Sequence, residues 1–197
     1  MDAKEVIQTL VALVGIVGFL FGVFQYRQAQ QWKRLEFAAS QLERLQSDPD
    51  LALASTFLDT SERGVPLPEK YWDFVGAHIF NHNCQTMYRA MAITYENTPE
   101  FFIYADVYSR LFGYLAQISA FIDMKLITVS DVKTLRWILQ DLARPQWAAD
   151  NRIFIGRIST EASDVLRLMD LFGIKHAALM LYDEIEALDR EYRGNAA

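Results

Sequence analysis

Residue types that build compact chemical sites are scarce in this sequence. Its 197 residues include a single cysteine, Cys84, and three histidines, so no disulfide can form within the chain. The sequence contains no glycine-rich phosphate loop, no G-x-S-x-G motif, no EF-hand loop and no zinc ribbon. It also has no internal repeat and no low-complexity tract. We therefore assign no catalytic residues and no cofactor, and an enzyme is not our first interpretation.

Signals for β-strands are missing as well. No stretch alternates apolar and polar residues over a sustained length, and no hairpin signal joins two such stretches. Apolar residues instead recur at helical spacing through most of the chain. We therefore expect an all-α fold that needs no strands.

Charge is absent from one long stretch, Val6 to Phe24. As a helix this stretch rises about 28 Å, close to the ~30 Å hydrocarbon core of a bilayer. The alternative is a cleaved signal peptide, which needs a basic start and small residues at its cleavage site. Here the first five residues are net acidic, and Gln25, Tyr26 and Arg27 follow the apolar run. We therefore expect an uncleaved, single-pass transmembrane anchor.

Basic residues flank this stretch unequally. Lys4 stands alone on the N-terminal side, whereas several Lys and Arg residues follow on the C-terminal side. Because Lys and Arg concentrate in cytoplasmic flanks, and Tyr and Trp at the interfaces, we expect the N-terminus outside and the rest of the chain in the cytoplasm. The residues expected at the cytoplasmic membrane interface are Tyr26, Arg27, Trp32, Lys33 and Arg34.

Three glycines share one face of the expected membrane helix. Gly15, Gly18 and Gly22 are spaced at i, i+3 and i+7, and the last two form a G-x-x-x-G pair. Small residues let helix backbones approach closely in lipid, although glycine is also simply common in membrane helices. The contact could be with a second copy of the chain or with another membrane protein.

The remaining charge is segregated along the chain. Residues 26–47 carry four basic and two acidic side chains, whereas residues 48–197 carry fourteen basic and twenty-one acidic ones. A basic collar suits anionic lipid, and an acidic body lacks the basic stripe that nucleic acid requires. We therefore expect the lipid bilayer as a partner and expect no nucleic acid.

The anchor helix is expected to continue into the cytoplasm, since no helix breaker occurs before Gln46. Trp32, Leu35, Ala39 and Leu42 are spaced 3-4-3, which indicates either a short coiled-coil seam or a stripe docked on the body. The expected segments are a transmembrane anchor at 1–25, a juxtamembrane stalk helix at 26–47, a cytosolic multi-helix bundle at 48–193 and a frayed tail at 194–197.

Helix-start signals divide the bundle. The helix after Pro99 has the broadest apolar face, so we expect Leu111 and Leu115 in its middle to be buried. Gly173 is the expected C-cap of a later helix. Capping residues or prolines predict helix starts at Ser47-Asp48-Pro49, at Pro68 for a helix reaching Met91, at Thr98-Pro99 and at Ser130-Asp131.

One pattern has the spacing of a metal site. On a helix, His78 and His82 at i and i+4 would lie on one face and could share a metal, although Ile79 replaces the glutamate of H-E-x-x-H. The alternative is two half-buried histidines on a helix flank, which we favour. A third ligand would have to come from Cys84, His176, Asp183 or Glu184.

Other reactive or polar groups have simpler interpretations. Cys84 lies on an expected apolar stripe, so a buried structural cysteine is favoured over a nucleophile. The acidic run 183–191 falls off an apolar stripe and fits a solvated helix face. Aromatic residues that could line a ligand pocket have helical spacing, which is more typical of a core; they are Phe101, Tyr104, Tyr108, Phe112 and Tyr114.

The order of these features resembles a family. The motifs are Gln30-Gln31-Trp32-Lys33-Arg34 after the anchor, Ser47-Asp48-Pro49 at a helix start, Phe121-Ile122-Asp123-Met124-Lys125-Leu126 after the aromatic helix, and Leu135-Arg136-Trp137 beyond it. Over residues 1–145 the chain resembles uncharacterised bacterial membrane-anchored helical proteins, catalogued as a domain of unknown function. The resemblance implies a bacterial inner-membrane protein with a helical cytosolic domain. It supplies no catalytic residues that could be assigned to this chain.

Three functions follow as hypotheses. The first is a scaffold or adaptor, or a self-assembling subunit, whose cytosolic helical domain binds a protein partner or a second copy. The second is an accessory subunit of a larger membrane complex, in which the anchor packs against a foreign helix. The third is a metal-dependent hydrolase that uses His78 and His82.

Overall fold

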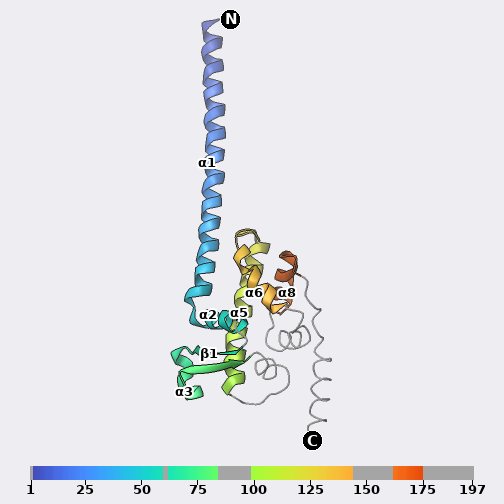
Figure 1. The fold of residues 1–197 in the computed structure, drawn as a ribbon. Helices are drawn as coiled ribbons and strands as arrows, with labels where there is room; N and C mark the ends of the chain where they lie inside the picture. Colours follow the sequence, from blue (N-terminus) through green and yellow to red (C-terminus); the bar gives the residue numbers. More distant parts are fainter. Residues whose placement is uncertain (1, 60–61, 84–98, 144–161, 175–197) are drawn as a thin grey trace.

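The computed structural model describes residues 2–59, 62–83, 99–143 and 162–174. Its longest element is α1, Ala3–Ser47, a single 45-residue helix that would measure about 68 Å. Figure 1 shows α1 as a rod whose first half extends well beyond the folded body. The prediction that the helix of residues 6–24 continues into the stalk is therefore confirmed.

The chain turns sharply after α1 because a capping residue and a proline start the next helix. This is α2, Pro49–Asp59. The Asp48 carboxylate accepts hydrogen bonds from the backbone N–H groups of Asp50 and Leu51, at 3.0 and 3.3 Å. These donors have no partner inside the helix, so the cap stabilises its first turn. The predicted start at Asp48-Pro49 is confirmed.

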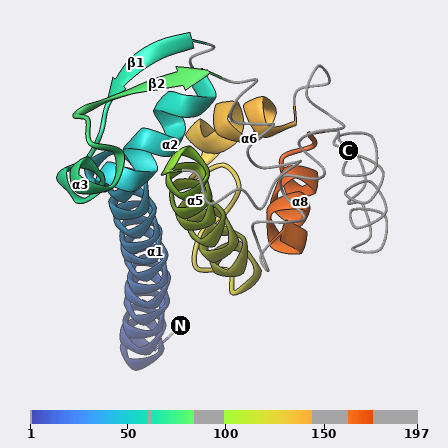
Figure 2. The same ribbon diagram turned by 90° about the horizontal axis from the view of Figure 1, so that it is seen from below.

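The body is built around α5, Pro99–Asp123. This helix contacts α2 on one side and α8, Ala162–Leu171, on the other, and Figure 2 shows α1, α5 and α8 side by side when viewed from below. Its broad apolar face is buried as predicted, with Leu111 and Leu115 both fully inaccessible. A helix with this width of apolar face needs several neighbours, and α5 has them.

The segment after α5 begins its helix later than expected. A 3₁₀ turn, η2 at Lys133–Leu135, leads into α6, Arg136–Leu142. Asp131 does not cap this helix, because its carboxylate accepts hydrogen bonds from the backbone N–H and the hydroxyl of Thr128, at 2.8 and 2.7 Å. The side chain therefore closes the loop after α5 instead of starting a helix.

The sequence predicted a fold without strands, and this prediction is wrong for one hairpin. Residues Glu62–Pro66 form β1 and Ile79–Asn83 form β2, an antiparallel pair in which Val65 lies opposite Phe80. Between them lie a 3₁₀ turn, η1 at Glu69–Tyr71, and the single-turn helix α3, Trp72–Val75. The expected helix from Pro68 to Met91 therefore ends at Gly76, a left-handed C-cap with φ 67°. The described part of the chain is otherwise mostly helical, so the predicted all-α class is confirmed there apart from this hairpin.

The docked face of α1 differs from the predicted stripe. Ala38 and Leu45 belong to the buried core, and Phe37 packs against it through an edge-to-face contact with Phe121 at 5.0 Å. Trp32 and Leu35 are instead 67% and 47% exposed. The docked-stripe interpretation is therefore wrong for Trp32, Leu35 and Ala39, which are exposed, and confirmed for Leu42, which packs against the core. The coiled-coil interpretation stays a prediction.

Candidate functional site

Apart from Arg34, the glycines and interface residues that the sequence predicts for the membrane lie on a part of α1 that the described body leaves uncovered. A Cβ atom added at Gly15, Gly18 or Gly22 would meet no other atom within 4 Å. Tyr26 is 65% exposed, and Arg27 and Lys33 are exposed too. Among the residues that the structure describes, no helix is both long enough and apolar enough to cross a bilayer.

Arg34 is held differently from the other interface residues. Its Nε atom lies 2.9 Å from a carboxylate oxygen of Asp131, 97 residues further along the chain. Burial alone would raise the pKa of Asp131, but hydrogen bonds from Thr128 and the charge of Arg34 outweigh burial and lower it below its usual value. Arg34 therefore ties the loop after α5 to α1.

The two histidines do not converge. His82 lies in β2, buried between elements: its Nδ1 atom is 3.1 Å from the hydroxyl of Tyr104, and its ring stacks on Phe57 at 4.7 Å. His78 is exposed and lies against Trp72, with ring centroids 4.2 Å apart. Side chains four residues apart on an extended chain are up to about 13 Å apart, too far to share a metal.

The metal hypothesis depended on a helix that contains both His78 and His82. The structure has a strand, β2, at His82 instead, so that prediction is wrong. Within the described residues, no group of three or more His, Cys, Asp or Glu side chains is arranged to hold a metal ion. The candidate third ligands, the acidic run 183–191 and the frayed tail lie outside the described residues. No observation favours the hydrolase hypothesis.

The aromatic residues of α5 belong to the core, and one of them, Tyr114, also lines an open cavity between α1, α2 and α5. Tyr104, Tyr108, Phe112 and Tyr114 are buried, and Phe101 packs against them at the edge of the core. The Tyr114 hydroxyl donates to the backbone carbonyl of Gln41 at 3.0 Å, and burial raises the pKa of Tyr114 to about 12. The core interpretation is confirmed for these side chains.

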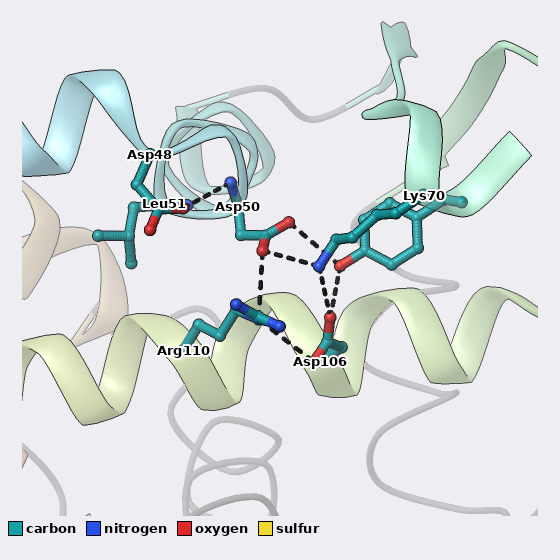
Figure 3. Close-up of polar contacts among 7 residues, drawn as sticks. Asp48, Asp50, Leu51, Lys70, Asp106 and Arg110 are labelled. Carbon is teal, nitrogen blue, oxygen red and sulfur yellow. Dashed lines mark hydrogen bonds and ion pairs between the residues drawn. The ribbon is translucent and has the colours of Figure 1, made fainter.

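The densest polar cluster joins three elements and was not predicted. Figure 3 shows Asp50 of α2, Lys70 of η1, and Asp106 and Arg110 of α5 converging on one another. Lys70 Nζ lies 2.7 Å from Asp50 and 2.9 Å from Asp106, and Arg110 Nε lies 3.2 Å from Asp50. The Tyr71 hydroxyl donates to Asp106 at 2.7 Å. Two acids thus face two bases.

We call this cluster of Asp50, Lys70, Tyr71, Asp106 and Arg110 the clamp, because its ion pairs and hydrogen bonds join three elements. Burial, followed by the hydrogen bond to Asp106, raises the pKa of Tyr71. Burial would raise the pKa of Asp106, but hydrogen bonds from Lys70 and Tyr71 outweigh it and lower that pKa. Asp50 is only 4% exposed and is compensated by both bases. Such a network holds α2, η1 and α5 in register.

An open cavity lies beside the clamp, between the end of α1, the start of α2 and the middle of α5. Its volume is about 470 Å³, and Arg44, Asp48, Arg110 and Gln117 are among the residues that line it. Arg44 donates to the Gln117 side chain at 3.1 Å across it. Arg44 and Arg110 each contact oxygen atoms of the chain, Arg44 through Gln117 and Arg110 through Asp50 and Asp106.

Comparison with known proteins adds no assignment. No protein-family model, curated protein or solved structure matches this chain.

Proposed function

We propose that this chain is a single-pass membrane protein, with the first half of α1 in the bilayer and the helical body in the cytoplasm, and that it works by protein association. One observation carries the proposal. The first half of α1 projects from the body (Figure 1). Between residues 13 and 24, apolar side chains are exposed on every side of the helix, among them Leu13, Phe19 and Phe24 at 53%, 71% and 63%. A helix that is apolar on every side is stable when lipid or protein covers it.

The whole uncharged stretch supports this proposal. It runs from Val6 to Phe24 without a charged residue, and as a helix it rises about 28 Å, close to the ~30 Å hydrocarbon core of a bilayer. The proposal rests on all of residues 6–24.

We place the association on α1 itself. Within the described part of the chain, a Cβ at any of the three glycines of α1 would meet no atom within 4 Å, so a second helix can approach the backbone there. Trp32 and Ala39, both exposed, follow Gly18 by 14 and 21 residues, which are two and three heptads. A left-handed pair of α1 helices would therefore bury Gly18, Trp32 and Ala39 along one seam. The alternative partner is a foreign membrane helix.

The experiment replaces Gly18→Leu and Gly22→Leu in the full chain. Two leucines would hold the helix backbones apart, so self-association in a membrane two-hybrid assay should fall to background. Val17→Leu is the matched control, because it adds a methylene about 100° round the helix from Gly18. Association that is unchanged by the glycine variants, or equally lost in the control, would contradict pairing through this face.

A further inference from the structure

The end of α5 has a lysine where helices usually have glycine. Leu126 N donates to Phe121 O and Lys125 N to Ile122 O, both at 3.0 Å, which is the Schellman arrangement. Lys125 occupies its left-handed position with φ 59°, the only non-glycine residue with positive φ in the described part of the chain. A side chain at this position strains the backbone.

A second helix end in this protein shows the usual solution. At the end of α8, Ile174 N donates to Met169 O and Gly173 N to Asp170 O, both at 2.9 Å. The left-handed residue there is Gly173, with φ 64°. The two motifs have the same hydrogen bonds and differ in the residue at the strained position. A strained residue held by its surroundings points to a role for its side chain, which in Lys125 is a cation.

Lys125 faces a cavity that also belongs to α1. This cavity has a volume of about 400 Å³ and lies between α1 and the loop after α5, lined by Gln30, Lys33, Arg34, Lys125 and Leu126 among others. Arg34 is bound to Asp131, and the nearby Asp123 is bound to Arg167. No ion pair within the described residues engages Lys33 or Lys125. One wall of the cavity is thus fixed by the Arg34–Asp131 ion pair, and its two lysines have no ion-pair partner among the described residues.

The position of this cavity matches the membrane surface. Gln30 and Lys33 follow Phe24 by six and nine residues, which is about 9–14 Å of helix beyond the hydrocarbon. The headgroup layer adds roughly 5–8 Å on each side of the hydrocarbon, and lysine side chains extend back towards it. In Figure 1 the loop after α5 lies at the end of the body nearest the N-terminus. Met124 and Leu126, on either side of Lys125, are 59% and 47% exposed.

We propose that Lys33 and Lys125 bind the phosphate of an anionic phospholipid headgroup, with Met124 and Leu126 resting in the interface. The inference depends on the proposed membrane anchor and adds a second contact, which fixes the body against the bilayer. Charge complementarity favours an anionic lipid over a zwitterionic one, and the exposed apolar pair favours a lipid over free phosphate.

The test uses the full chain inserted into nanodiscs of equal phosphatidylcholine and phosphatidylglycerol. After gentle extraction, mass spectrometry of the intact protein measures the ratio of the two lipids that remain bound. We expect enrichment of phosphatidylglycerol on the unchanged chain. Lys125→Gly should lower that enrichment about fivefold, and Lys33→Gln in addition should lower it about as much again. Arg63→Gln, in β1 near the opposite end of α5, is the control and should have no effect.

Stability separates this role from a structural one. Because glycine suits φ 59°, Lys125→Gly should melt at the same temperature as the unchanged chain or higher. Equal lipid ratios in all variants, loss of enrichment with Arg63→Gln, or displacement of the lipid by inorganic phosphate would overturn the inference. Failure of the chain to insert into either lipid would instead overturn the membrane anchor.

Discussion

At the scale of single residues, the contacts that hold the body together join positions that are distant in sequence. Asp50, Lys70 and Asp106 meet from three elements, and only the Asp106–Arg110 pair, four residues apart on one helix, is visible in the sequence. His82 is similar, since its partners Phe57 and Tyr104 lie in α2 and α5. Such side chains cannot be assigned before the packing is known, because helical spacing reports only neighbours on the same element.

The two histidines give a direct prediction at this scale. His82→Ala removes a buried stacking contact and a hydrogen bond, so the free energy of unfolding should fall by roughly 2–4 kcal/mol. His78→Ala, at an exposed position, should change it by less than about 0.5 kcal/mol. Thermal unfolding of the full chain in mild detergent measures both. Equal effects of the two variants would contradict the different burial of these side chains.

At the scale of elements, helices were predictable and the hairpin was not. Asp48-Pro49, Pro99 and Gly173 mark helix ends that the structure confirms, because capping chemistry is local. In β2 the burial of side chains alternates, but the sequence Ile-Phe-Asn-His-Asn does not alternate apolar and polar residues. In β1 the strand contains a glycine and ends in proline. Neither segment therefore has the sequence pattern of a strand. The pairing depends on apolar contacts with α2 and α5.

The docked part of α1 was also misplaced, since two apolar stripes on that helix have the same period. Phe37, Ala38 and Leu45 face the core, whereas Trp32 and Leu35 do not. Periodicity predicts that a helix has an apolar face but cannot say which of two faces meets the body. The last turns of α1 lie within residues 26–47, which the sequence assigned to a stalk. These turns contribute Phe37, Ala38 and Leu45 to the core of the body.

Truncation tests this assignment of α1. A chain starting at residue 26 keeps Phe37, Ala38 and Leu45, whereas a chain starting at residue 48 loses them with the Tyr114–Gln41 hydrogen bond. Burial of two large apolar side chains contributes roughly 3–6 kcal/mol, so the shorter chain should melt about 6–20 °C lower. Differential scanning calorimetry of the two fragments measures the difference. Equal melting temperatures would show that α1 is only a stalk.

At the scale of the whole molecule, an acidic helical body follows a rod that carries no charge from Val6 to Phe24. The body is fixed to the last third of the rod by Arg34–Asp131, Phe37–Phe121 and Gln41–Tyr114. Any constraint on the outer half of α1 is thereby transmitted to the orientation of the body. This arrangement suits a module that is presented at a membrane surface, since the connection is a continuous helix and not a flexible linker.

We propose that the body of this protein lies on the cytoplasmic side of a membrane that α1 spans. The most direct measurement is the activity, in a bacterial host, of two reporters fused after Ala197, one active only in the periplasm and one active only in the cytoplasm. Arg27, Lys33 and Arg34 outnumber Lys4, so the cytoplasmic reporter should be active in the membrane fraction and the periplasmic reporter silent. Periplasmic activity would contradict the cytoplasmic location of the body. A reporter found entirely in the soluble fraction would contradict the membrane anchor.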